Sequence, residues 1–185
     1  MGLMENPSLH KIFMISEDLV NPHKLYESPS WSMWLELSHR KDTRLSLKEV
    51  NSESLWGEMF SLRSEVEKEF GDFSSEDIKK MISAIKHQVE NNHGKWFLTY
   101  LNEECVGEIG IIPISYNGKV IYRLQDVDIL SSFRGQGLGN DLINAISNLA
   151  LDEKVFSLCL RADANDWKKD WYLRYGFQKV GEVGS

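Results

Sequence analysis

The sequence has no long hydrophobic run and very little cysteine. Nowhere in its 185 residues do about 18 apolar residues follow one another, and residues 1–20 carry charges but no long apolar core. We therefore expect neither a membrane span nor a signal peptide, and we expect a cytoplasmic protein. The two cysteines, Cys105 and Cys159, each lie in an apolar, strand-like run. This setting is typical of small buried thiols rather than of a disulfide framework.

The sequence also lacks an excess of positive charge. Its 21 basic and 28 acidic residues give a net charge of -7. Because binding to nucleic-acid phosphates needs a basic surface, we expect no nucleic-acid partner, whereas a cationic substrate is electrostatically acceptable. The five histidines do not cluster at the spacing of metal ligands, so we expect no metal site.

The most informative stretch of the chain runs from Arg123 to Leu151. An apolar and acidic strand is followed by a Ser-Ser-Phe link, by the glycine loop of residues 134–140, and by a helix. Glycines let the backbone approach a ligand closely, and the N–H groups at the start of a helix favour an anion. The stretch therefore predicts a phosphate site. The helix itself is indicated by apolar residues at three- and four-residue spacing, namely Leu138, Leu142, Ala145, Ile146, Leu149 and Ala150.

Two nucleotide-binding motifs do not fit the glycine loop. A dinucleotide-binding loop would have a third glycine at position 140, which is Asn140, and a P-loop would need a Lys-Ser/Thr pair that is absent here. An ordinary glycine-rich turn between a strand and a helix remains the structural alternative, since short motifs also occur by chance.

The remaining sequence predicts one domain of the α+β (mixed α/β) class, covering residues 44–185, after an N-terminal extension of residues 1–43. The Asn117-Gly118 pair between two apolar runs predicts a hairpin. Ser74 and Asp77 are typical of a helix start. The first helix is expected to bury one face from Leu55 to Phe70 and to end at Gly71. The expected strands are 45–50, 96–101, 105–116, 119–130, 154–161 and one after 177, and the expected helices follow residues 52, 74, 138 and 167.

Within the extension, two short runs look like strands, Ile12–Ile15 and Trp31–Leu37. The second alternates large apolar residues with smaller or polar ones, as a half-buried strand does. Only eight residues follow Phe177, which leaves room for one strand at that end of the chain. We therefore expect residues 31–37 to add a strand at this edge of the sheet, within the chain or exchanged in a homodimer.

The glycine loop resembles the Arg/Gln-x-x-Gly-x-Gly/Ala signature of the GNAT superfamily of N-acetyltransferases, at Arg134, Gly137 and Gly139. A Tyr-x-x-x-Gly-Phe helix end at residues 172–177 resembles the same family. The resemblance covers about residues 96–177. It implies a central, largely antiparallel sheet with helices on both faces, and acetyl-CoA (coenzyme A) as the cofactor. In the family the preceding strand holds the pantetheine arm, the loop amides hold the pyrophosphate, and an Asn after the next strand contacts the cofactor. The cofactor-binding residues that it implies are Val127, Asp128, Ile129, Arg134, Gly135, Gln136, Gly137, Leu138, Gly139, Asn140, Asn165 and Tyr172.

Two residues are the candidates for catalysis, Tyr172 and Asp126. By resemblance Tyr172 protonates the leaving thiolate, although an aromatic helix face around it also fits a core tyrosine. Asp126 lies where the diamine and polyamine branch of the family has a Leu-Glu-Asp segment, but the glutamate of that segment is replaced here by Gln125. An amide cannot accept a proton at useful pH, so Asp126, Asp128 or a water chain would serve as the base. The alternative for Asp126 is a solvated strand end or an ion pair with Arg123.

The resemblance implies an N-acetyltransferase that moves an acetyl group from acetyl-CoA to a primary amine by direct attack, without a metal. The acceptor would be a small-molecule amine or a protein amine. Both classes stay open because the residues that contact an acceptor usually come from variable loops and helices, which the motifs do not cover. The missing glutamate leaves a second hypothesis open, a non-catalytic coenzyme-A-binding domain that senses or scaffolds. These two hypotheses differ in turnover, not in cofactor binding.

Overall fold

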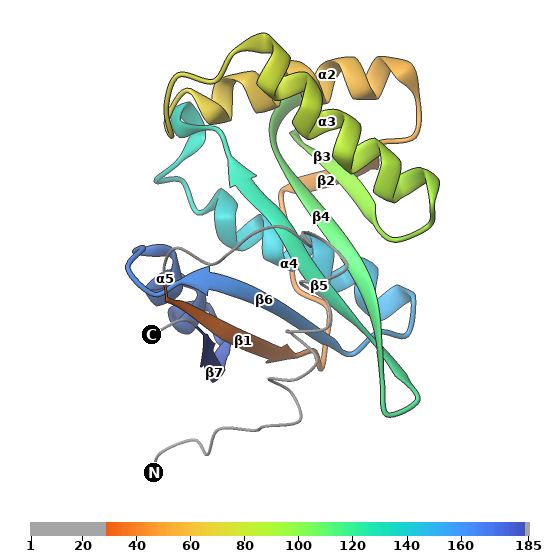
Figure 1. Ribbon diagram of the computed structural model, residues 1–185. Helices are drawn as coiled ribbons and strands as arrows, with labels where there is room; N and C mark the ends of the chain where they lie inside the picture. The colour runs from red at the N-terminus through yellow and green to blue at the C-terminus, as the bar shows by residue number, and fades with distance from the viewer. Residues whose placement is uncertain (1–28, 184–185) are drawn as a thin grey trace. The chain divides into compact units, whose positions relative to one another are not determined.

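The computed structural model describes residues 29–183, which form a mixed α/β fold with seven strands and helices (Figure 1). The strands are hydrogen-bonded in the order β2-β3-β4-β5-β6-β1-β7. β5 and β6 pair in parallel, whereas the pairs β2–β3, β3–β4, β6–β1 and β1–β7 are antiparallel. None of the helices in this part of the chain is long and apolar enough to cross a membrane. The elements are β1 (Ser30–Glu36), β2 (Leu45–Glu49), α2 (Glu53–Glu67), α3 (Ser75–Glu90), β3 (Lys95–Leu101), β4 (Glu104–Tyr116), β5 (Lys119–Ile129), a 3-10 turn η1 (Ser131–Phe133), α4 (Leu138–Asp152), β6 (Ser157–Asp163), α5 (Lys168–Tyr175) and β7 (Gln178–Val183).

The chain forms two compact units. One unit contains His39–Pro113 and Leu124–Lys154, and therefore β2, β3, α2, α3, α4, most of β4 and the end of β5. The other contains the chain up to Ser38, Ile114–Arg123 and the chain from Val155 onwards. It holds β1, the tip of the β4–β5 hairpin, β6, α5 and β7. In the first of these units α2 and α3 lie on one face of the strands and α4 lies on the other (Figure 1).

The local signals in the sequence are confirmed. Asn117 and Gly118, between β4 and β5, both have positive φ, as a tight hairpin turn requires. The side chain of Ser74 accepts a hydrogen bond from the backbone of Asp77, whose carboxylate accepts one from the backbone of Ser74. This capping box starts α3, whereas at the start of α2 the Ser52 side chain accepts a single hydrogen bond, from the backbone N–H of Leu55. Each of these features depends on a few neighbouring residues, and it forms where those residues predict it.

The strand predicted from residues 31–37 is present as β1, but its expected place at the edge of the sheet was wrong. β1 pairs antiparallel with β6 on one side and with β7 on the other. Its side chains are buried on both faces, and Ser32 and Met33 have no exposed surface. A strand that has neighbours on both sides and covers on both faces is an interior strand, so β7 is the edge strand instead. The run Ile12–Ile15 lies outside the described residues.

Two predicted boundaries were also wrong. α2 ends at Glu67, and Phe70, which was expected on its buried face, is 59% exposed. β6 starts at Ser157 rather than at residue 154, and Phe156, just before it, is 55% exposed. In both cases an apolar residue that continues the spacing of the predicted element lies beyond its end and is exposed. Helix and strand ends are the least certain part of any pattern.

Candidate active site

The glycine loop forms an anion-binding arrangement at the start of α4. Gly135 and Gly137 have φ of 77° and 81°, and Gly137 is the N-cap residue of the helix. No described residue accepts a hydrogen bond from the backbone N–H groups of residues 135–139. An added Cβ at Gly135 would meet no atom within 4 Å, so the space beside this glycine is open. Unpaired amides together with the positive end of the helix dipole favour a phosphate group here.

Arg44 connects the glycine loop to the first turn of α4, a role that no motif or spacing in the sequence indicates. Its guanidinium donates to the backbone oxygen of Gln136 at 2.7 Å and is ion-paired with Asp141, in the first turn of α4, at 2.5 Å. An added Cβ at Gly137 would lie 3.4 Å from the same guanidinium. The contacts therefore join the segment before β2 to a loop almost a hundred residues away in the sequence, a distance of 92 positions for Gln136.

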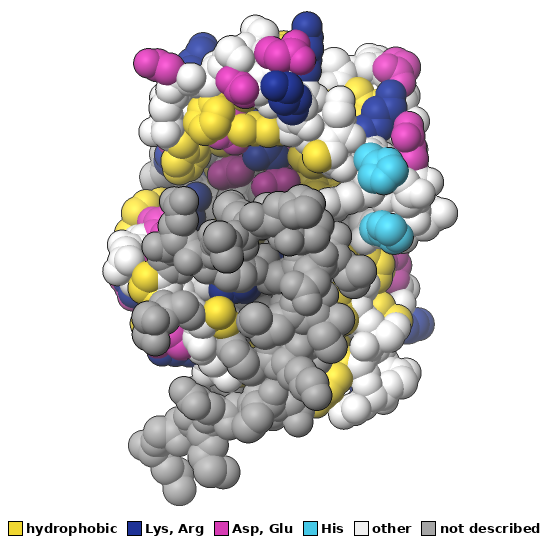
Figure 2. Space-filling model, in the orientation of Figure 1, with side chains coloured by type: hydrophobic (Ala, Val, Ile, Leu, Met, Phe, Trp, Pro, Cys, Tyr) yellow, Lys and Arg dark blue, Asp and Glu magenta, His cyan; other side chains and the backbone are white. Residues whose placement is uncertain are grey.

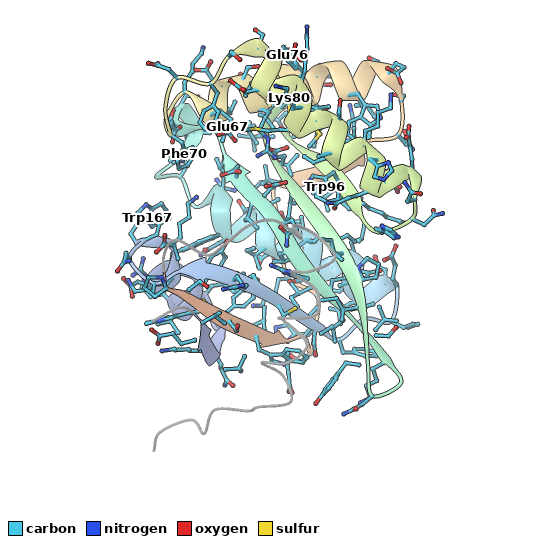
Figure 3. All side chains as sticks on the ribbon, in the orientation of Figure 1. Glu67, Phe70, Glu76, Lys80, Trp96 and Trp167 are labelled. Carbon is cyan, nitrogen blue, oxygen red and sulfur yellow. The ribbon has the colours of Figure 1, made fainter. Side chains whose placement is uncertain are left out.

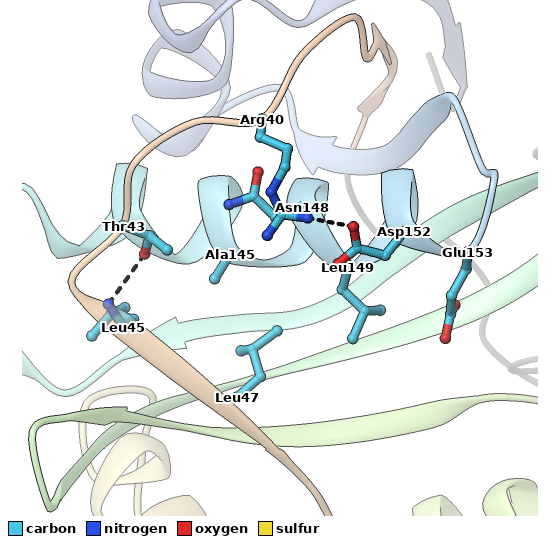
Figure 4. A pocket seen from close by; sticks show the side chains of 9 residues that line it. All are labelled: Arg40, Thr43, Leu45, Leu47, Ala145, Asn148, Leu149, Asp152 and Glu153. Carbon is cyan, nitrogen blue, oxygen red and sulfur yellow. Dashed lines mark hydrogen bonds and ion pairs between the residues drawn. The ribbon is translucent and has the colours of Figure 1, made fainter.

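A pocket of about 320 Å³ lies between the same segment, β2 and α4 (Figure 4). The floor is apolar, with Leu47, Ala145 and Leu149, and the rim is polar. At the rim Arg40 is ion-paired with Asp152. None of the predicted site residues lines this pocket, whose residues are Arg40, Thr43, Leu45, Leu47, Ala145, Asn148, Leu149, Asp152 and Glu153.

Arg134, the first residue of the glycine motif, binds within the protein. Its Nε donates to the backbone oxygen of Ile129 at 2.9 Å, and its terminal guanidinium nitrogen lies 2.6 Å from a carboxylate oxygen of Glu69. Arg134 therefore connects the end of β5 to the segment that follows α2. The predicted cofactor residues Val127, Asp128 and Ile129 precede this contact on β5 and belong to the same unit as the glycine loop.

Asp126 has an unusual backbone conformation and two strong partners. Its φ is 46°, in the left-handed region that few residues other than glycine, asparagine and aspartate adopt, although it lies within β5. The indole Nε1 of Trp96, on β3, donates to Asp126 Oδ2 at 2.9 Å. The guanidinium of Arg63, on α2, lies 3.1 Å from the same oxygen. The expected alternatives, a solvated strand end or an ion pair with Arg123, are therefore replaced by an ion pair with Arg63.

The second oxygen of Asp126, Oδ1, makes no hydrogen bond to any residue in the range 29–183. The side chain is 32% exposed. Since the hydrogen bond from Trp96 and the ion pair with Arg63 are both made at Oδ2, the carboxylate keeps one oxygen available for an ammonium group or for the proton of an attacking amine.

Arg63 and Glu108 form a buried ion pair behind Asp126, and sequence reasoning missed both residues. Arg63 Nη2 lies 2.7 Å from Glu108 Oε1, and the Glu108 side chain has no exposed surface. Burial, reinforced by Asp126 and Asp128 and opposed by Arg63, raises the pKa of Glu108 well above its usual value. Burial alone would lower the pKa of Arg63, but Asp126, Glu108 and Asp128 outweigh it and leave that pKa raised. Arg63 therefore stays charged.

Acidic and basic side chains lie together in a hollow beside a hydrophobic patch on the face shown in Figure 2. Near the end of α2, Glu67 is the fourth carboxylate around Arg63, at 3.4 Å from its guanidinium (Figure 3). The exposed aromatic residues of this part of the chain are Phe70 and Phe73. Among residues 29–183, no group of three or more histidine, cysteine, aspartate and glutamate side chains could hold a metal ion.

Asn165 and Tyr172 lie in the other unit, on the turn after β6 and on α5. The backbone N–H of Asn165 donates to Asp163 Oδ1 at 2.7 Å, which forms the turn, and the residue is exposed. Tyr172 is 5% exposed and packs on Trp171 and Phe177, at ring-centroid distances of 4.5 and 5.4 Å. This packing suits a core tyrosine, and it also fixes the ring, as a catalytic role needs.

Comparison with known proteins agrees with the geometry of the glycine loop. Residues 92–179 match the family model "Acetyltransferase (GNAT) domain". A thialysine N-epsilon-acetyltransferase from Bos taurus is 34% identical over 85 residues, which cover 43% of this chain and 48% of that protein. The chain therefore spans about half the length of this relative.

Two solved structures have the same fold. A protein described as a predicted acetyltransferase with acetyl-CoA, from Clostridium acetobutylicum, has a TM-score of 0.55 at 17% identity and covers 73% of this chain and 90% of its own. A transcriptional regulator from Bacillus halodurans has a TM-score of 0.61 at 18% identity, with 76% and 97% covered. Proteins with this fold thus include both an acetyltransferase and a regulator by description.

Proposed function

Because residues 92–179 are a GNAT acetyltransferase domain, we propose that this protein moves an acetyl group from acetyl-CoA to a primary amine by direct attack. The observation that carries the proposal is the glycine loop, whose amides at residues 135–139 have no acceptor among the described residues. Such amides at a helix start suit a pyrophosphate, which is the most highly charged part of coenzyme A. Arg134 and Arg44 hold the loop in this form.

The residues assigned to the cofactor are consistent with this arrangement. The loop of residues 134–140 would bind the pyrophosphate, and the backbone groups of Val127, Asp128 and Ile129 would bind the pantetheine arm. When bound, acetyl-CoA supplies a thioester whose carbonyl carbon accepts the amine. By resemblance to the family, Asn165 and Tyr172 are further cofactor-binding residues.

Three protein groups would carry the chemistry. An amine with a pKa of about 10 must lose a proton before it attacks, and Asp126 Oδ1 would accept that proton directly or through water. The backbone N–H of Ile129 would donate to the carbonyl oxygen as negative charge develops on it. The hydroxyl of Tyr172 would give its proton to the departing sulfur. The proton taken from the amine and the proton given to the thiolate are then balanced through solvent.

The acceptor is proposed to be a cationic amine. Arg63 lies among the carboxylates of Glu67, Glu108 and Asp126, and Asp128 also contributes negative charge to this group. The curated relative is named for an enzyme that acetylates the ε-amine of thialysine, which is such an amine. Together these observations support an ammonium-bearing acceptor, either a small molecule or a protein side chain.

The test of turnover measures thiol release from acetyl-CoA over a panel of amines. Tyr172→Phe keeps the ring and removes only the proton donor, so it should fold and bind cofactor while kcat falls by about 10²–10⁴-fold with little change in KM for acetyl-CoA. Tyr175→Phe is the matched control, because Tyr175 lies on the same helix and its ring also faces Phe177, at 6.0 Å. Equal kcat in the two variants would make Tyr172 a core residue.

The test of cofactor binding compares two glycines with the same backbone strain. Gly137→Val and Gly118→Val both place a branched residue at positive φ, 81° and 74°, but only Gly137 belongs to the loop. Coenzyme A binding, measured by calorimetry, should be lost in the first variant and kept in the second. Equal affinities would refute the phosphate assignment.

A non-catalytic coenzyme-A-binding domain is the second candidate, because Gln125 replaces the family's carboxylate and a transcriptional regulator shares the fold. It predicts coenzyme A binding that depends on Gly137 but no thiol release with any amine in the panel.

A further inference from the structure

Arg63 occupies an unusual position, buried and surrounded by carboxylates from three elements. It comes from α2 and is 6% exposed. Its guanidinium contacts Glu67 on its own helix, Glu108 on β4 and Asp126 on β5, at 3.4, 2.7 and 3.1 Å. The charged groups that face Asp126 are therefore Arg63 and Glu67 from α2 and Glu108 from β4, together with Asp128 on its own strand. Trp96 on β3 adds a neutral donor.

We propose that Arg63 is a positioning residue for Asp126, and that Glu108 in turn holds Arg63 in place. Arg63 holds the Asp126 carboxylate by Oδ2, so that Oδ1 is left for the acceptor amine. This inference rests on the proposed role of Asp126 in acetyl transfer. It assigns a function in the reaction to two buried residues that would otherwise belong only to the core.

The contacts explain how Arg63 can hold Asp126 although four carboxylates, Asp126 among them, lie around its guanidinium. If Glu108 were ionised, it would compete with Asp126 for the charge of Arg63, since both lie near the same nitrogen, Nη2. Burial raises the pKa of Glu108, which favours its neutral form and so reduces its competition with Asp126 for the guanidinium charge. A neutral carboxylic acid still accepts the contact from Arg63, and so it fixes the guanidinium without cancelling its charge.

Ordinary structural support would not need this arrangement. Replacing a buried ion pair by neutral residues of similar size is often harmless to stability, whereas removing one partner is damaging. If the ion pair is only structural, replacing Arg63 and replacing Glu108 should have similar effects. The positioning role predicts different effects on Asp126, because only Arg63 carries the positive charge that contacts it.

The experiment follows the ionisation of Asp126 in the protein without cofactor or acceptor. The indole N–H of Trp96 donates to Asp126 Oδ2 at 2.9 Å, so its NMR signal, assigned with Trp96→Phe, should shift when that carboxylate gains a proton. In Arg63→Met the midpoint should move to higher pH by about one unit or more, as expected when an opposite charge is removed within about 4–6 Å. Arg63→Lys should bring it back towards the wild-type value. Glu108→Gln, which resembles the neutral acid, should leave it unchanged.

The same variants are then assayed for acetyl transfer as a function of pH. The acid limb of kcat/KM should follow the NMR midpoint, moving up in Arg63→Met and staying in place in Glu108→Gln. Equal midpoints in all variants, or equal shifts in Arg63→Met and Glu108→Gln, would overturn the proposal. If Arg63→Met does not fold, the double variant Arg63→Met/Glu108→Gln removes both charges and should show the same upward shift.

Failure of the proposed function would look different. An enzyme without turnover on any amine would refute acetyl transfer but would still give the NMR shifts if Arg63 controls Asp126. Asp126→Asn should abolish the titration of the Trp96 signal. If the titration persists in Asp126→Asn, the signal reports another group and the positioning role is refuted.

Discussion

Gly110→Ala tests how closely the strands under the active site are fitted to each other. Gly110, on β4, lies directly opposite Trp96 on β3, and the indole covers the glycine. A Cβ at position 110 would lie 2.4 Å from Cε2 and 2.6 Å from Nε1 of that indole. The ring cannot simply rotate away, because Trp96 is 2% exposed and its Nε1 donates to Asp126. The added methyl group must therefore push the indole off its hydrogen-bond partner.

The expected loss of stability follows from two contributions. Overpacking a rigid core typically costs about 1–3 kcal/mol, and a buried donor that loses its acceptor costs about 1–3 kcal/mol more. We expect the free energy of unfolding to fall by about 2–5 kcal/mol, and the urea midpoint to fall by about 1 M or more. Because Trp96 also holds Asp126, kcat for acetyl transfer should fall in the protein that remains folded.

Gly57→Ala is the control for a glycine without a close neighbour. Gly57 lies in α2, and an added Cβ there would meet nothing within 4 Å. Alanine is the better helix former, so this variant should be more stable than wild type by about 0.5–1 kcal/mol. A Gly110→Ala protein as stable as wild type, measured beside a stabilised Gly57→Ala, would refute the close fit of Trp96.

Two further predictions concern titrating groups. The pKa of Glu108 in the folded protein lies well above 4.5, so its contribution to stability is present below pH 4.5 and is lost as the pH rises through the folded pKa. In urea titrations, Glu108→Gln should therefore become more stable relative to wild type as the pH rises. A difference in stability that stays constant across pH would contradict this. Burial raises the pKa of Cys105 to about 11 and of Cys159 to about 12; at pH 8 about 10⁻³ or less of each thiol is ionised, so dithionitrobenzoate should react far faster with the urea-unfolded protein than with the folded one, and equal rates would count against burial.

The elements that could be predicted from the sequence are those whose causes are local. The Asn117-Gly118 turn, the capping box of Ser74 and Asp77, and the glycine loop each depend on the conformational preferences of a few adjacent residues. The same holds for α4, whose apolar spacing is continued by packing along its length. In these segments the local preference and the final structure agree, which is typical of a sequence that folds consistently.

The elements that could not be predicted depend on partners far away in the chain. Residues 31–37 have the pattern of a half-buried strand, but only the pairing with β6 and β7 makes β1 an interior strand. Arg44 precedes a strand in a polar stretch, and nothing in its neighbours indicates that it binds the glycine loop. Phe70 and Phe156 show the reverse case, in which an apolar residue that fits the local spacing lies beyond the end of the element and remains exposed.

Asp126 shows how the two kinds of information combine. Its position before the glycine loop made it a candidate, but the sequence alone supported a solvated strand end or an ion pair with Arg123 equally well. The distant residues Trp96 and Arg63 decide between these interpretations, because both engage Oδ2 and neither engages Oδ1. An aspartate at a solvated strand end would have no reason to adopt a φ of 46° or to hold two buried donors on one oxygen. The conformation of Asp126 is therefore imposed by its surroundings, and the oxygen left over is the one that an incoming amine could use.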